Sequence, residues 1–140
     1  MISTLLVMTG GNAKAKEKDC HCALFHYSTA DSDHSQSLTR VGTFASSLAE
    51  DGDSSQAFRV GELETTVFVA KQGPEPMFVL GLSVLRAGSK AMEIDVVEAR
   101  IPFAQWRRGR ENGLEVRKTV IGDGRNQHFL AICRFRKPWL

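Results

Sequence analysis

The chain has 140 residues, of which 42% are hydrophobic and 24% are charged, and its formal net charge is +2 at pH 7. This composition is too apolar for a disordered protein, and the length suits one domain that buries roughly two thirds of the surface exposed by its unfolded form. No run of about eighteen or more apolar residues is present, which excludes a helix that spans a bilayer. We therefore expect a single domain over residues 1–140, which needs neither a disulfide nor a metal to fold.

The cysteines bear on the cellular compartment. There are three, an odd number, and Cys20 and Cys22 are too close in sequence to form a disulfide easily. The first eight residues also lack the basic leader and the cleavage pattern of a signal peptide. These features predict free thiols in a reducing, cytoplasmic location.

The first half of the chain predicts two strands and then a helix. Residues 2–8 and 20–28 are apolar enough for short strands. Leu38, Val41, Phe44 and Leu48 then recur at spacings of three, three and four residues, which is the pattern of one apolar stripe on an α-helix. We expect this amphipathic helix to end at residues 51–53, where the sequence is Asp-Gly-Asp.

The second half predicts mainly antiparallel strands. Residues 65–71 and 77–85 form a hairpin signal around a turn with two prolines, and the second strand is apolar at both parities, as in a strand covered on both faces. A strand over residues 92–101 follows, with a slip in parity that is typical of a β-bulge. Pro102 suits the first position of a short helix over residues 102–112.

A second hairpin joins residues 114–121 to residues 128–136. Pairing Ile121 with His128 places Phe129, Cys133 and Phe135 on one face of the last strand, opposite the apolar side chains of the preceding strand. The fold class predicted from these elements is α+β. It is a single domain dominated by an antiparallel β-meander, with one amphipathic helix before the main strands and one short helix near residues 102–112.

Charge is distributed unevenly along the chain. Residues 98–140 carry ten Lys and Arg against four Asp and Glu, whereas residues 1–97 carry eight against twelve. Arginine presents a planar fork to carboxylates and phosphates, and aromatic residues are interleaved with the arginines of this segment. The residues that we expect to bind a partner are Trp106, Arg107, Arg108, Arg110, Arg117, Arg134 and Arg136. A competing interpretation is that carboxylates of the same monomer neutralise this segment.

Other candidate chemistry is weak. Cys20, Cys22 and His26 share a strand parity and His34 follows, but the spacing is not that of a structural zinc site. Cys133 and His128 lie at opposite parity in one strand, which disfavours a nucleophilic pair. The Walker and dinucleotide glycine patterns are both absent from the sequence. We therefore expect no metal site, no cofactor and no catalytic residue.

These observations favour a small, non-enzymatic, intracellular interaction module. We expect its Arg- and aromatic-rich C-terminal surface to bind a protein partner or a second copy of the chain, and we expect no membrane partner. Two alternatives stay open. One is a nucleic-acid-binding protein, whose affinity should fall steeply with salt. The other is a small enzyme with a Cys/His-lined or Arg-lined anion site.

Overall fold

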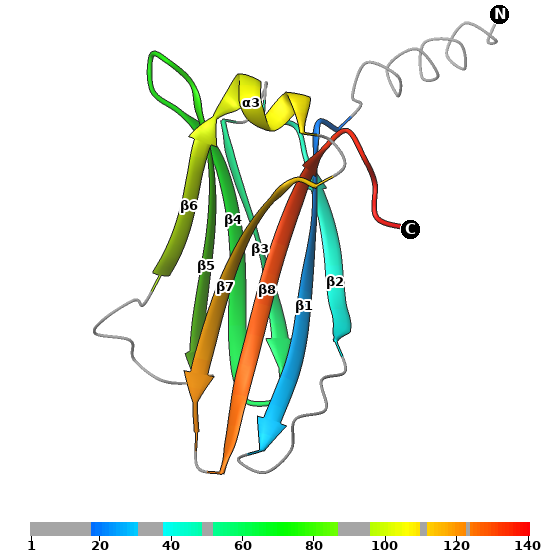
Figure 1. Cartoon of the computed structure of the whole chain (residues 1–140), viewed down its shortest axis with the longest axis vertical. Coiled ribbons are helices and arrows are strands. Elements are labelled where there is room, and N and C mark those ends of the chain that lie inside the picture. The colour runs from blue at the N-terminus through cyan, green and yellow to red at the C-terminus, as the bar shows by residue number, and fades with distance from the viewer. Residues whose placement is uncertain (1–17, 31–37, 49–51, 87–95, 110–111, 123) are drawn as a thin grey trace, which may run out of the picture.

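The computed structural model describes residues 18–30, 38–48, 52–86, 96–109, 112–122 and 124–140. In this part of the chain eight strands form two four-stranded antiparallel sheets that face each other (Figure 1). The first sheet has the order β2-β1-β8-β7 and consists of β1 (Cys20–Ala30), β2 (Thr39–Ser46), β7 (Leu114–Ile121) and β8 (Arg125–Phe135). The second has the order β3-β4-β5-β6 and consists of β3 (Asp53–Val60), β4 (Leu63–Gln72), β5 (Met77–Arg86) and β6 (Val96–Pro102).

The strand order follows the chain around the molecule. Consecutive strands are neighbours, and β8 returns to pair with β1. Two seams interrupt the hydrogen bonding, one where β2 lies beside β3 and one where β6 lies beside β7. This is the order of an up-and-down barrel that has opened along two seams into a sandwich. A sandwich of this kind has two ends, at which the strands of both sheets stop. Two of the candidate sites described below lie at these ends.

The predicted α+β class is wrong, because the described part of the chain is mostly antiparallel strand with one short helix, α3 (Phe103–Arg108). The predicted helix around residues 38–48 is instead β2. The pairing of β1 with β2 shifts register between Leu24 and Phe25, which leaves Val41 as an extra residue. The bulge lets Val41 and Phe44 both pack against the core. A bulged strand thereby reproduces the three-residue spacing of a helical stripe.

Several other predicted elements are present in the structure. The strand from Cys20 is β1, and the hairpin around residues 72–76 is formed by β4 and β5, which pair over their whole lengths. β5 is buried on both faces over most of its length, as its sequence predicts. The short helix expected at residues 102–112 is present as the six-residue α3. The strand predicted at residues 2–8 lies outside the described residues.

The second hairpin is confirmed with a tighter turn. Ile121 pairs with Asn126 rather than with His128, so the register differs from the prediction by two residues. A shift of two residues preserves which side chains face the core. Phe129, Cys133 and Phe135 are accordingly buried, as expected.

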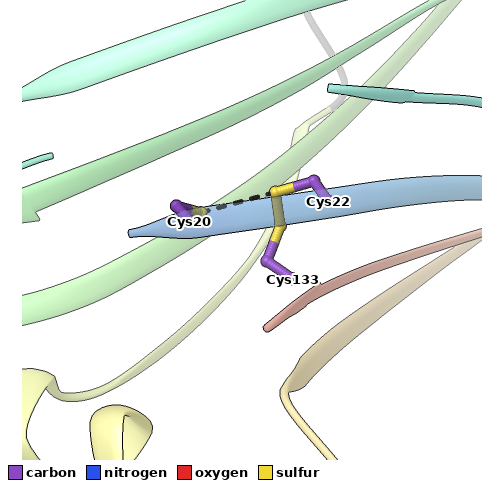
Figure 2. A group of neighbouring side chains, drawn as sticks. All are labelled: Cys20, Cys22 and Cys133. Atoms are coloured by element: carbon purple, nitrogen blue, oxygen red, sulfur yellow. Dashed lines mark hydrogen bonds between the residues drawn. A yellow bond between two sulfur atoms is a disulfide. The ribbon is translucent and has the colours of Figure 1, made fainter. Parts of the chain in front are cut away.

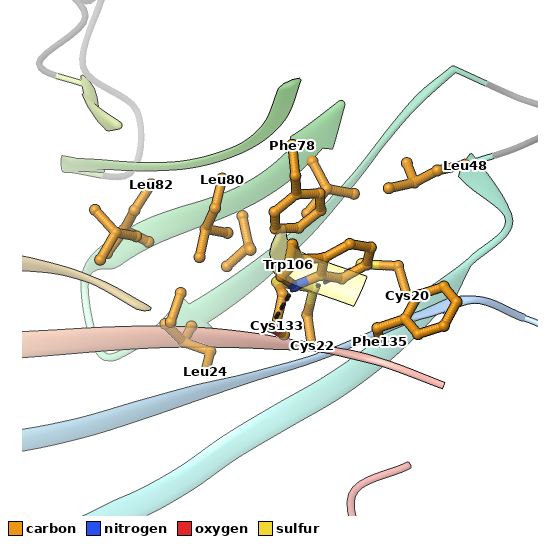
Figure 3. Close-up of a cluster of buried hydrophobic side chains, with 14 of the residues drawn as sticks. Cys20, Cys22, Leu24, Leu48, Phe78, Leu80, Leu82, Trp106, Cys133 and Phe135 are labelled. Atoms are coloured by element: carbon orange, nitrogen blue, oxygen red, sulfur yellow. Dashed lines mark hydrogen bonds between the residues drawn. A yellow bond between two sulfur atoms is a disulfide. The ribbon is translucent and has the colours of Figure 1, made fainter. Parts of the chain in front are cut away.

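Helix α3 closes one end of the sandwich. Figure 1 shows it lying across that end, and its buried residues Phe103 and Trp106 belong to the core. Figure 3 shows the Trp106 side chain among the core residues. The Trp106 side chain is 1% exposed and stacks on Phe78 with ring centroids 3.8 Å apart. Its indole Nε1 donates a hydrogen bond of 3.0 Å to the carbonyl oxygen of Cys133. The helix is therefore anchored to both sheets by one side chain.

Candidate functional site

Three arginines gather at the end of the sandwich that α3 closes. Arg107 and Arg108 form the last turn of α3, and Arg136 follows directly after β8. The guanidinium carbons of Arg107 and Arg136 lie 5.3 Å and 5.1 Å from the centroid of the Phe135 ring. Beside them is a hollow of about 310 Å³ lined by Ala104, Arg107, Arg108 and Phe135. We call Arg107, Arg108 and Arg136 the arginine patch.

Backbone conformation brings Arg136 to this patch. Strand parity alone placed Arg136 on the same face as Arg134. However, β8 ends at Phe135, and Arg136 adopts a left-handed conformation with φ of 51°. Its amide donates a hydrogen bond of 2.8 Å to the carbonyl oxygen of Asp19. Because a left-handed residue reverses the chain direction locally, parity does not extend beyond the end of the strand.

The arginine patch lacks carboxylate partners within the described part of the chain. The ion pairs there join Arg86 to Glu62 at 3.0 Å, Arg100 to Glu98 at 3.5 Å and Arg117 to Glu115 at 3.5 Å. None of them involves the three patch residues, all of which are solvent-exposed. The positive charges of the patch therefore face solvent.

Arg134 has a different environment. Its guanidinium carbon lies 3.6 Å from the centroid of the Trp139 ring, and its Nη2 donates to the carbonyl oxygen of Pro138 at 2.7 Å. Trp139 in turn packs edge-on against Phe25 of β1 and donates from Nε1 to the carbonyl oxygen of His21 at 3.1 Å. Arg134 thus holds the C-terminal segment against the outer face of the first sheet.

The structure therefore brings together only part of the predicted binding set. Arg107, Arg108 and Arg136 lie together, whereas Arg117 lies on β7 and Arg134 holds the C-terminal segment. Trp106 is in the core, although sequence reasoning placed it on the binding surface. Arg110 lies outside the described residues.

The opposite end of the sandwich contains a larger cavity of about 470 Å³, which we call the end cavity. It lies between the sheets, where the β3–β4 and β7–β8 turns approach the ends of β1 and β5. Its inward-facing polar groups are His26 and Gln127, whose Nε2 and Oε1 atoms are 2.6 Å apart. Arg86, Arg125 and Glu62 also line it, beside apolar side chains such as Leu63. Sequence reasoning missed Gln127, although it has the same parity in β8 as Phe129.

Three sulfur atoms form a cluster in the core, shown in Figure 2. Cys22 and Cys133 form a disulfide across the β1–β8 pair, and the Cys20 Sγ atom lies 3.6 Å from the Cys22 Sγ atom. All three side chains are 1% exposed or less. The expectation of free thiols is thus wrong for two of the cysteines. Sequence reasoning missed the bond because its partners are 111 residues apart and meet only through strand pairing.

The remaining thiol of this cysteine cluster (Cys20, Cys22 and Cys133) is strongly perturbed. Burial raises the pKa of the Cys20 thiol well above its ordinary value of 9.0, and the neighbouring Asp19 carboxylate raises it further. Burial and Asp19 therefore favour the protonated thiol of Cys20 over its thiolate. His26, which the sequence grouped with Cys20 and Cys22, bonds to Gln127 instead. His34 lies outside the described residues.

Among the described residues, no helix is both long enough and apolar enough to cross a membrane. Comparison of the chain with protein-family models, with curated proteins and with solved structures found no match.

Proposed function

We propose that the protein is an interaction module whose arginine patch binds an acidic segment of a partner protein. One observation carries this proposal: Arg107 and Arg108 line a hollow together with Phe135, Arg136 lies over the same Phe135 ring, and none of the three arginines has a carboxylate partner in the described part of the chain. A carboxylate that enters the hollow would relieve the repulsion among the three charges and accept forked hydrogen bonds from them.

The surroundings of the patch favour a peptide over a nucleic acid. Single-stranded nucleic acids bind where aromatic rings offer their faces for base stacking. Phe103, Trp106 and Phe135, which pack beside the patch, are all buried, and the half-buried Trp139 ring is covered by Arg134, so these rings do not provide such a platform. A symmetric dimer through the patch is also unfavourable, because a two-fold interface would place the same positive charges against each other.

Binding of a polyglutamate peptide, measured by fluorescence anisotropy, tests the proposal. The triple variant with Arg107→Ala, Arg108→Ala and Arg136→Ala should bind at least about tenfold more weakly, since each charge-assisted hydrogen bond is worth roughly 1.5–3 kcal/mol before solvent screening. A matched control replaces Arg100 and Arg117, which pair with carboxylates on β6 and β7. Equal affinities for the two variants would refute the proposal. Tighter binding of a single-stranded oligonucleotide than of the peptide would support the nucleic-acid alternative instead.

A second candidate function is binding of a small anionic ligand in the end cavity. The inward-facing pair of His26 and Gln127 favours it, because ligand pockets combine apolar walls with a few directed polar groups. Arg125 would supply positive charge at the wall of the cavity, where Arg86 is already paired with Glu62. Octanoate serves as the probe. It should raise the unfolding temperature of the wild type, and the variant with Gln127→Leu and Arg125→Ala should lose this effect. No shift in the wild type would remove the candidate.

The cytoplasmic location remains a proposal as well. Disulfides persist mainly in oxidising compartments, so the bond between Cys22 and Cys133 counts against it. Free thiols can be counted in protein taken from acid-quenched cells. Three free thiols would support a reducing cytoplasm, and one free thiol would refute it.

A further inference from the structure

The cysteine cluster brings together three soft donor atoms that the proposed function does not use. The sulfur atoms of Cys20, Cys22 and Cys133 all lie within 4.8 Å of one another. In this state two of them are joined in the disulfide, which leaves one thiol. We propose that reduction of this disulfide converts the cluster into a three-coordinate thiolate site for a soft monovalent metal ion, Cu(I).

The spacing of the sulfur atoms suits such a site. With metal–sulfur bonds of about 2.3 Å, the length found in zinc thiolates, three sulfurs at the corners of a planar triangle lie about 4.0 Å apart. The Cys20 and Cys22 sulfurs are already 3.6 Å apart. After reduction, the sulfurs of Cys22 and Cys133 need only separate by side-chain rotation, since their backbones stay opposite each other in the β1–β8 pair.

The donor set selects the metal. Zinc in structural sites takes four ligands, but no fourth Cys, His, Asp or Glu belongs to the group among the described residues. Soft thiolates favour Cu(I), whereas harder ions prefer oxygen ligands. A buried three-sulfur group therefore fits Cu(I) better than a divalent ion.

The surrounding structure holds the donors in place. Cys20 and Cys22 are on β1 and Cys133 is on β8, and these are the two central strands of the first sheet. The indole of Trp106 donates to the carbonyl oxygen of Cys133, which fixes the backbone of that residue (Figure 3). Arg107 and Arg136 lie over Phe135, the residue that pairs with Cys20, so positive charge lies at the same end of the sandwich as the cysteine cluster and as the Asp19 carboxylate beside Cys20.

An external reductant supplies the two electrons that cleave the Cys22–Cys133 bond and give two protein thiols. A thiol reductant also supplies the two protons and becomes a disulfide, whereas a phosphine becomes its oxide and the oxygen atom and both protons come from water. Cu(I) then bonds to three sulfurs, and each sulfur that becomes a thiolate releases its proton to solvent. The oxidation state of copper does not change. Formation of the disulfide removes two of the three donors and so releases the ion.

The test is an anaerobic titration of the full chain with Cu(I) against bicinchoninate. After reduction with a phosphine and its removal, the wild type should take up one Cu(I) per chain and gain thiolate-to-copper absorption in the ultraviolet. Unreduced protein, titrated with ascorbate in place of the phosphine, should take up none. The Cys20→Ala variant keeps the disulfide and supplies a matched control. Its reduced form should bind roughly tenfold more weakly or worse.

Three results would overturn the proposal. They are equal affinities for the reduced wild type and Cys20→Ala, uptake by the unreduced protein, or tighter binding of Zn(II) than of Cu(I) by the reduced wild type. Circular dichroism follows the fold in parallel. If reduction unfolds the chain, recovery of the β-sheet signal on addition of Cu(I) supports the site. Failure to recover, with no copper bound, refutes it.

Discussion

Replacement of Trp106 by Phe separates a structural role from a role in binding. The indole stacks on Phe78 and donates its N–H to the buried carbonyl oxygen of Cys133. Phenylalanine would keep an aromatic ring but remove the indole donor from that buried carbonyl, which costs about 1–3 kcal/mol. The smaller ring also leaves a void, which adds roughly 1 kcal/mol given that complete truncation of a buried Trp costs about 3–5 kcal/mol. We expect Trp106→Phe to lower the free energy of unfolding by about 2–4 kcal/mol.

Trp139 provides the matched control. Its indole also donates to a carbonyl oxygen, that of His21, but it lies half-buried on the outer face of the first sheet. Water can replace the lost donor there, so Trp139→Phe should cost less than about 1 kcal/mol. Urea unfolding without reductant, followed by the fluorescence of the single remaining Trp, measures both variants. Similar costs for the two variants, or a cost below about 0.5 kcal/mol for Trp106→Phe, would refute this reasoning. If the Trp106→Phe protein were as stable as the wild type but no longer bound polyglutamate, Trp106 would have a role in binding.

Three further predictions concern the core. A Cβ atom at Gly81 would lie 1.8 Å from the Phe68 ring, so Gly81→Ala should cost about 1–3 kcal/mol in thermal unfolding, and adding Phe68→Leu should restore part of it. Reduction of the Cys22–Cys133 bond, which spans 111 residues, should cost roughly 4–5 kcal/mol in urea unfolding, whereas an unchanged midpoint would mean that the bond does not constrain the unfolded chain. Because the pKa of the Cys20 thiol is raised in the folded protein, the unfolded chain loses this proton at a lower pH than the folded protein does. The free energy of unfolding should therefore be constant well below pH 9.0 and fall above it by up to about 1.4 kcal/mol per pH unit. Cys20→Ala should show a shallower decline above pH 9.0, and equal slopes would contradict the assignment.

The sequence by itself determined the strands that have a regular period of two. The inward face of β8 follows from alternation, and the hairpin of β4 and β5 follows from its turn residues and from the continuous apolar run of β5, because each is a local property of the chain. The predicted register of the last hairpin was wrong by two residues. An even shift leaves the same side chains on the buried face, so the prediction of that face was still correct. The candidate Arg107 and Arg108 likewise lie beside each other because they are adjacent in one short helix.

Tertiary structure decided what depends on distant partners or on breaks in local regularity. The bulge at Val41 turned an apparent helical stripe into β2, because pairing with β1 outweighs the weak local preference for helix. The disulfide exists because β1 and β8, far apart in sequence, pair in a register that puts Cys22 opposite Cys133. Trp106 became a core residue because α3 folds over the open end of two sheets, which no local pattern specifies. Arg136 reached Arg107 through a single left-handed residue at a strand end, where alternation no longer holds.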